Sequence, residues 1–215
     1  MIEKITLFDL DHTLLSANCS YHFGAYLYRH GYFKTPTMLK LVGVYFLQKI
    51  KIISLQQLHT LVFNLIFLNK DANHLKKLIE SFTPEFLEKY SYLPAIERLT
   101  KAKSLGYFTA ILSNSPDFLV GPIAAILGVN IWKSTVYEID DKGQFSKISS
   151  FVEGIDKADY LNAFLQQFNL VKISTTAYSD SILDLPFLLA AGTPVAVNPD
   201  RQLRRHALEN NWEIL

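Results

Sequence analysis

One short apolar strand followed by a long helical stretch, and only then by alternating strands and helices, constrains the fold of this chain most. Residues 3–10 are apolar and end in acids, which is typical of a buried central strand. Residues 18–90 have a helical pattern and no convincing strand. Helix starts are indicated there at Thr35, Ser54, Asp71 and Thr83.

Strands and helices alternate from about residue 94 onward. Helices are predicted over residues 94–105, 116–127, 156–168 and 182–191, strands over 107–113, 172–179 and 194–198, and a hairpin over 134–139 and 144–150. Ser115 is the expected N-cap of the second of these helices, with Pro116 at its first position. This alternation predicts an α/β fold: a Rossmann-like parallel sheet with helices on both faces and a helical cap inserted after the first strand. Residues 1–15 and 92–215 would form the catalytic core, and residues 16–91 the helical cap domain.

Charge is uneven between these two parts, although the whole chain carries a net charge of only +1. Residues 16–91 carry a net charge of +5 and the rest of the chain −4. A basic cover over an acidic core suits a metal site with an anionic ligand above it, and solvated helix faces explain the asymmetry equally well. The near-neutral total gives no indication of nucleic-acid binding.

Compartment and membrane association follow from the termini and the apolar stretches. Cys19 is the only cysteine, so no internal disulfide can form, and we interpret it as a packed core residue. The first nine residues do not resemble a signal peptide, so a cytoplasmic location is expected.

Residues 52–68 lack formal charge but have helical spacing, and we interpret them as an amphipathic helix packed on its neighbours. A membrane-surface helix is the less favoured interpretation, because their polar face lacks lysine and arginine.

Two carboxylates, Asp9 and Asp11, stand two residues apart where the first strand ends. Residues two apart on a strand share a face, and open α/β sheets bind ligands at the carboxyl ends of their strands. Both side chains can therefore approach one reacting centre.

Three further signals follow at later strand ends and helix starts. Ser113 and Asn114 end the next strand where a helix begins, which is a natural seat for phosphate. Lys157 lies at a helix start, where its charge is unfavourable unless an anion is near. Asp180 can ligate a hard cation such as Mg²⁺, and Asp184 lies one helical turn further, within reach of Lys157. Each signal alone has an ordinary structural explanation, as a cap or a surface charge.

The four signals together resemble the haloacid dehalogenase superfamily. The tail Ser179-Asp180-Ser-x-x-Asp184-Leu-Pro, with Pro-Val-Ala-Val-Asn-Pro-Asp after it, is similar to the phosphoserine-phosphatase-like branch, subfamily IB. Ser179 departs from the glycine that many members have. The position of the helical insert also matches the family's cap.

The resemblance implies a Mg²⁺-dependent phosphatase that forms an aspartyl-phosphate intermediate. It implies that Asp9 is the nucleophile and a metal ligand, and that Asp11 is the general acid and base, with its backbone carbonyl on the metal. It also implies that Ser113 and Lys157 hold the phosphoryl oxygens, that Asp180 binds Mg²⁺, and that Asp184 supports the site. Thr13 and Asn114 are further expected phosphate contacts.

Three other interpretations stay open at this point. The aromatic cap with its lysines could admit a lipid phosphate, as in relatives similar to phosphatidylglycerophosphate phosphatases, although we favour these aromatics as the cap's own core. A phosphoryl transferase would pass the group from Asp9 to an alcohol. A non-catalytic phosphate-binding module is disfavoured by the intact set of acids. The substrate is expected to be a small phosphate ester of unknown identity, and the oligomeric state is undetermined.

Overall fold

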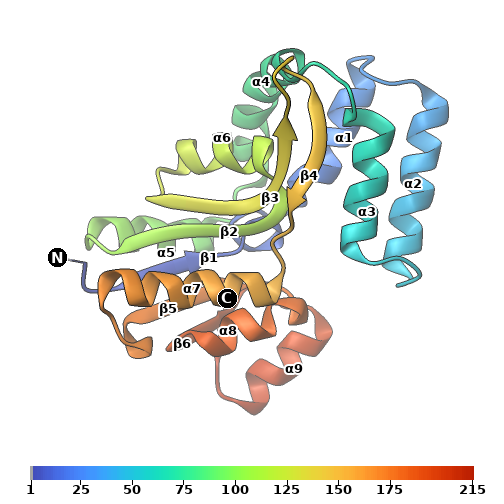
Figure 1. Ribbon diagram of the computed structural model, residues 1–215. Helices are drawn as coiled ribbons and strands as arrows, with labels where there is room; N and C mark the ends of the chain where they lie inside the picture. The colour runs from blue at the N-terminus through green and yellow to red at the C-terminus, as the bar shows by residue number, and fades with distance from the viewer. Residues whose placement is uncertain (1) are drawn as a thin grey trace.

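The computed structural model describes residues 2–215, which form a sheet of seven strands in the order β4-β3-β2-β1-β5-β6-β7 (Figure 1). All neighbouring strands are parallel except β3 and β4, which form the expected antiparallel hairpin. The strands are β1 (Ile5–Phe8), β2 (Phe108–Pro116), β3 (Ile131–Ile139), β4 (Phe145–Ser150), β5 (Thr175–Ser179), β6 (Thr193–Ala196) and β7 (Glu213–Ile214). The predicted α/β fold is confirmed.

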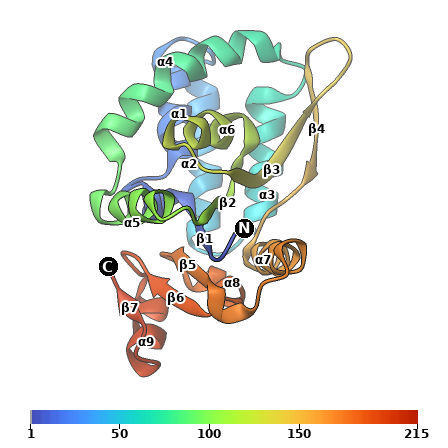
Figure 2. The ribbon, with the colours of Figure 1, turned by 90° about the vertical axis from the view of Figure 1, so that its left-hand side faces the viewer.

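Helices cover both faces of this sheet (Figure 2). One core holds Phe8 and Ile111 with the apolar faces of α5 (Leu93–Ser104) and α6 (Asp117–Leu127). The other core holds Leu7 with those of α7 (Gly154–Phe168), α8 (Leu185–Ala190) and α9 (Arg201–Glu209). All four residues of β1 are buried, as expected of the central strand, and this is why its sequence is apolar without alternation.

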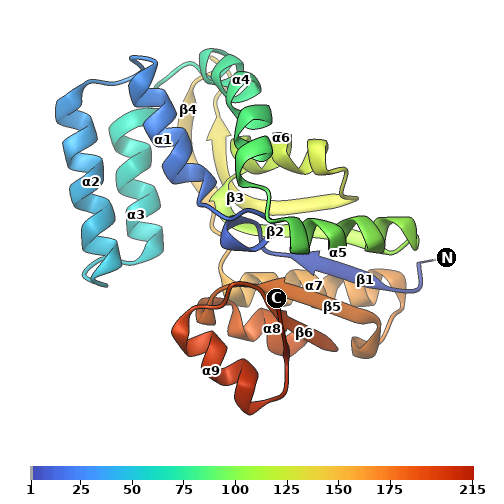
Figure 3. The same ribbon diagram turned by 180° about the vertical axis from the view of Figure 1, so that it is seen from behind.

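The inserted cap consists of helices between β1 and α5, to one side of the sheet (Figure 3). They are α1 (Cys19–Arg29), α2 (Thr35–Lys49), α3 (Leu55–Val62), which continues into a turn of π-helix (Phe63–Phe67), and α4 (Ala72–Tyr90). Leu15 and Ser91 form an isolated antiparallel bridge where the chain leaves and re-enters the core. The domain boundaries at 15/16 and 91/92 remain a prediction, and this bridge supports them.

Two predicted helix starts are wrong. Thr83 lies inside α4, where its hydroxyl donates to the Ile79 carbonyl at 2.8 Å, and α4 continues through Pro84. The helix of residues 116–127 begins at Asp117 and not after a Ser115 cap, because β2 extends to Pro116 and the Ser115 side chain hydrogen-bonds elsewhere. The strand predicted over 172–179 and the helix predicted over 182–191 begin too early, since each segment starts with a single 3-10 turn.

None of the helices in residues 2–215 combines the length and apolar character that crossing a bilayer requires.

Candidate active site

The carboxyl ends of β1, β2 and β5 bring the predicted site residues to one edge of the sheet. Asp9 directly follows β1, Ser113 lies near the end of β2, and Asp180 directly follows β5. These strands are neighbours, with Phe8 in register with Ile111 on one side and Tyr178 on the other. Parallel strands that end together place their following residues around a single point.

Lys157 forms the centre of a buried charge cluster at this edge. Its Nζ lies 2.6 Å from Oδ1 of Asp9 and 2.6 Å from Oδ2 of Asp184. Ser179 donates to the same oxygen of Asp184 at 2.6 Å. The serine that departs from the family's usual glycine is thus a buried hydrogen-bond donor that orients Asp184. The unfavourable position of Lys157 in the first turns of α7 is offset by these two carboxylates.

Gly154 allows α7 to start close enough for this cluster to form. A Cβ at this position would lie 2.1 Å from the backbone carbonyl oxygen of Leu183, so only glycine fits without movement. The close approach places the first turns of α7 against the segment that carries Asp184. A larger residue would therefore require the start of α7 and the backbone at Leu183 and Asp184 to move.

Burial and mutual repulsion perturb the ionisation of this cluster. Burial, with repulsion from Asp184 and Asp11, raises the pKa of Asp9 to about 7 despite the attraction of Lys157. Burial and the charges of Asp9 and Asp184 raise the pKa of Asp180 to about 8. Burial disfavours the charge on Lys157, but Asp184 and Asp9 outweigh it and raise its pKa above the ordinary value. The site therefore contains more negative charge than one lysine neutralises.

The donor set fits a divalent cation. Thr13 Oγ1 lies 3.4 Å from Oδ2 of Asp9 and 3.5 Å from Oδ1 of Asp180, so the two carboxylates face a common hydroxyl. Among residues 2–215 no three acidic, histidine or cysteine side chains converge on one point. The expected set needs only two carboxylates and the Asp11 carbonyl, and Mg²⁺ usually keeps several water ligands. Burial first, and then repulsion from neighbouring carboxylates, raise the pKa values of Asp9 and Asp180, and a bound cation would favour the ionised forms.

Asp11 turns toward the start of the cap. Its Oδ1 accepts from the backbone N–H of Cys19 at 2.7 Å, at the N-terminus of α1. Its Oδ2 accepts from Ser115 Oγ at 2.6 Å and from Asn18 Nδ2 at 3.2 Å. Asp11 is thereby held between the core and the first cap helix. Burial raises the pKa of the Cys19 thiol well above its usual value, in keeping with a packed core residue.

The two residues of the predicted phosphate-binding position, Ser113 and Asn114, differ in whether their side chains are free to donate to a ligand. Ser113 Oγ accepts from the backbone N–H of Ser115 at 3.1 Å, and no acceptor for its own hydroxyl hydrogen occurs in the described part of the chain. The Asn114 side chain instead donates to the Val152 carbonyl at 3.1 Å and accepts from His59 Nε2 at 2.6 Å. The predicted phosphate contact of Asn114 is therefore less well supported than that of Ser113.

His59 is a site residue that sequence reasoning missed. It lies on α3 of the cap, and its Nδ1 is 3.0 Å from the Tyr137 hydroxyl. Because Asn114 Oδ1 can only accept, Nε2 carries the proton and Nδ1 accepts from Tyr137. Burial lowers the pKa of His59, which favours this neutral form. The only signal in the sequence was a polar residue beside the apolar stripe of that helix.

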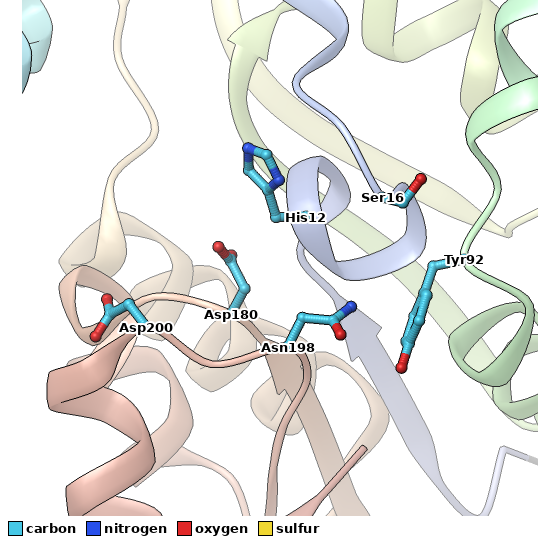
Figure 4. Close-up of a pocket in the computed structure, with 6 residues that line it drawn as sticks. All are labelled: His12, Ser16, Tyr92, Asp180, Asn198 and Asp200. Atoms are coloured by element: carbon cyan, nitrogen blue, oxygen red, sulfur yellow. The ribbon is translucent and has the colours of Figure 1, made fainter.

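Two cavities meet at this site. The larger, of about 1130 Å³, extends from Asp9, Asp11, Ser113, Lys157 and Asp180 to the apolar side chains of α2 and α3. A smaller one of about 370 Å³ is lined by His12, Ser16, Tyr92, Asp180, Asn198 and Asp200 (Figure 4). In this view His12 lies on the helical turn that follows β1 and Asp180 on the loop that follows β5. Both residues line both cavities. Asp200 accepts from Ile182 N and caps α9, which gives it a structural role.

Comparison with known proteins identifies the family. The model of haloacid dehalogenase-like hydrolases matches residues 6–189, most of the chain. The chain belongs to the haloacid dehalogenase-like hydrolase family. This HAD hydrolase is 27% identical over 226 residues to a histidinol-phosphatase of Neisseria meningitidis, a match that covers 100% of the chain and 99% of the relative.

Solved structures share this fold. A protein of unknown function from Bordetella pertussis superposes with a TM-score of 0.88 at 24% identity, covering 100% of this chain and 99% of that one. A phosphoserine phosphatase with a phospho-aspartyl intermediate analogue gives a TM-score of 0.68 at 17% identity, covering 100% and 93%. The family match and the phosphatase relatives make this HAD hydrolase an enzyme of the phosphatase class.

Proposed function

We propose that this protein is a Mg²⁺-dependent phosphatase that hydrolyses a phosphomonoester through an aspartyl phosphate on Asp9. The observation that carries the proposal is the placement of Lys157 Nζ, 2.6 Å from both Asp9 and Asp184, in a buried site that also holds Asp180. A phosphate dianion repels a carboxylate nucleophile, and a buried lysine offsets that repulsion.

Asp9 and Asp11 divide the chemistry between them. An oxygen of Asp9 attacks phosphorus while Asp11 donates its proton to the departing alcohol oxygen. Asp11 then removes a proton from water, and the water oxygen attacks the phosphoryl group and releases phosphate from Asp9. The product alcohol and phosphate together contain one water more than the ester.

The other groups bind and orient the ester. Ser113 donates its free hydroxyl to a phosphoryl oxygen, and Lys157 neutralises another. Asp9, Asp180 and the backbone carbonyl of Asp11 would hold Mg²⁺, which when bound stabilises negative charge on the transferring oxygens. Asp184, fixed by Ser179, keeps Lys157 charged and directed at Asp9.

The large cavity favours esters with an apolar leaving group over small polar ones. Histidinol phosphate and phosphoserine, the substrates named for relatives, are the polar candidates. The cavity beyond the carboxylates is instead lined by apolar side chains of α2, α3 and the loop between them (Met38, Leu41, Val42, Ile52, Leu55 and Leu58). Apolar lining with a few polar groups at one end suits an amphiphilic ligand.

Phosphate release from an aryl phosphate tests the reaction class. We expect turnover with Mg²⁺, loss of turnover with a chelator, and loss in Asp9→Asn. Wild-type turnover that survives either change would contradict the proposal. The ratio of kcat/KM for decyl phosphate to that for phosphoserine then tests the cavity argument, and added acceptor alcohols would reveal phosphoryl transfer in place of hydrolysis.

A further inference from the structure

Helix α2 is apolar around its circumference, yet none of its residues is buried. Its inner side chains, among them Met38, Leu41 and Tyr45, line the large cavity. Its outer side chains include Leu39, which is 69% exposed, and Phe46, which is 61% exposed. Helices that are apolar on all sides are normally buried, so the outer face of α2 lacks a cover in the isolated chain.

The exposed outer residues form one stripe along the helix. Leu39, Phe46, Leu47 and the C-cap Ile50 follow one another at spacings of seven, one and three residues, which places them on one side of a helix. We call these four residues the outer stripe. None of them lines the cavity beneath α2. Figures 1 and 3 show α2 at the outer edge of the molecule, with α3 between it and the sheet.

Positive charges lie near both edges of this stripe. By helical spacing Lys40 lies on one side and Lys49 on the other, and Lys51 follows the C-cap. All three are exposed, and Lys49 and Lys51 also line the cavity. Residues 12–70 contain no aspartate or glutamate at all. A partner for this surface must therefore be apolar and negatively charged at once.

Charge also distinguishes between the partners that could cover the stripe. A second copy of the chain packed stripe to stripe would bring the two sets of lysines together without a counter-charge. A bilayer that contains anionic lipids supplies both properties, because apolar side chains enter the headgroup boundary and lysines contact the anionic headgroups.

We propose that α2 docks on an anionic lipid surface through the outer stripe and its flanking lysines. The 15-residue helix lies in the interface and does not cross it. Docking brings the cavity, lined by the opposite side of the same helix, next to the bilayer. The disfavoured membrane-surface helix concerned residues 52–68, whose polar face lacks lysine and arginine and which contain α3 and the π-helical turn after it. The contact surface proposed here belongs instead to residues 35–50.

Vesicle sedimentation of the full chain tests the proposal. Vesicles of phosphatidylcholine with phosphatidylglycerol are compared with phosphatidylcholine alone, in chelator so that no divalent ion bridges the headgroups. We expect binding to the mixed vesicles, weaker binding at high salt, and little binding to the neutral ones. The triple variant Leu39→Gln, Phe46→Gln, Ile50→Gln should reduce the apparent affinity by about tenfold or more.

A matched variant controls for the loss of exposed apolar residues in general. Leu105, Ile173 and Leu208 are 53%, 77% and 62% exposed, and changing these three to Gln should leave vesicle binding unchanged. Both triple variants should hydrolyse a soluble aryl phosphate as the wild type does, because neither set lines the cavity. This readout separates a failure of docking from a failure of the proposed function.

Three results would overturn the docking proposal. One is a wild-type chain that stays in the supernatant with both kinds of vesicle. Another is an outer-stripe variant that melts like the wild type and still binds fully. The third is sedimentation equilibrium showing a wild-type dimer and a monomeric outer-stripe variant, since a second copy would then cover α2.

Discussion

Ser115 Oγ donates a 2.6 Å hydrogen bond to Oδ2 of Asp11 and thereby joins the ends of two neighbouring strands across the site. Ser115 itself is almost fully buried. The bond holds the predicted general acid and base in one position while the cap begins directly above it. Its geometry explains why Ser115 does not serve as the helix cap expected from sequence.

Replacing Ser115 by Ala should reduce kcat and leave KM nearly unchanged, because the residue orients Asp11 and does not bind the ester. A hydrogen bond to a charged group contributes about 1.5–3 kcal/mol, so a reduction of roughly 10- to 160-fold is expected. Steady-state kinetics with an aryl phosphate measure both parameters. Ser146→Ala, which removes a bond to the Glu138 carbonyl far from the site, is the control and should change neither parameter.

Removing the charge of Lys157 should damage both stability and activity. Lys157→Met leaves Asp9 and Asp184 buried without their common partner, which costs about 3–5 kcal/mol of unfolding free energy. Loss of one stabilising donor should lower kcat by about 10²–10³. Denaturant unfolding and phosphate release measure the two effects.

The double variant Lys157→Met, Asp184→Asn identifies the cause of the instability. It should recover part of the lost free energy, because one uncompensated buried carboxylate is gone, but it should recover no activity. Lys147→Met, which breaks an exposed ion pair with Glu138, is the matched control with little expected effect. Equal losses of unfolding free energy in Lys147→Met and Lys157→Met would show that the buried ion pairs contribute no more to stability than the exposed one.

Gly154→Ala should destabilise the protein, because the new Cβ would meet the Leu183 carbonyl oxygen at 2.1 Å. Forced repacking of this kind costs about 1–3 kcal/mol. The shift of α7 should also separate Lys157 from Asp184 and lower kcat. Gly43→Ala on α2, where no atom beyond its chain neighbours and the nearby backbone of the same helix lies within 4 Å of the new Cβ, should be neutral or stabilising by up to about 1 kcal/mol. Thermal and denaturant melts compare the two.

Metal-free protein should lose stability as pH rises from about 4 to about 8. Burial and neighbouring acids raise the pKa of Asp9 to about 7 and that of Asp180 to about 8 in the folded state. In the unfolded chain the pKa of an Asp side chain is about 3.9. The folded state therefore binds more protons between these values, and its stability falls with rising pH until both groups are ionised.

Mg²⁺ should reverse this trend, because it binds the ionised carboxylates. The increase in melting temperature on adding Mg²⁺ should be small near pH 6 and grow toward about pH 8, where Asp180 loses its proton. Asp180→Asn should remove most of the dependence. A Mg²⁺ effect that is the same at both pH values would contradict the assignment of these carboxylates as the metal site.

The fold was predictable because its signals are local and periodic. The buried strand of β1, the alternation after residue 94 and the N-caps at Ser54 and Asp71 are properties of short segments. The helix start predicted at Thr83 was wrong, because Pro84, which usually marks a helix start, is tolerated inside α4. The Thr83 hydroxyl donates a hydrogen bond to the Ile79 carbonyl within this helix. The last elements, α9 and β7, were not predicted, since they are short and depend on packing against β6.

The contacts of the site were predictable only where a motif carried them. The proximity of Asp184 to Lys157 was expected from helical spacing and is observed. The partners of Asp11 and Asn114 were not foreseen, because Ser115 and His59 reach them from another strand and from the cap. Such contacts depend on tertiary geometry that one sequence does not encode locally.

The most direct test of the central claim is to trap the phosphorylated enzyme. The protein is mixed with an aryl phosphate and Mg²⁺, quenched in acid within a few turnovers, digested and analysed by mass spectrometry. We predict one added phosphoryl group, carried by the peptide that contains Asp9, and its absence from Asp9→Asn. Steady turnover of the wild type with no phosphorylated peptide, or with the group on a different residue, would contradict the account.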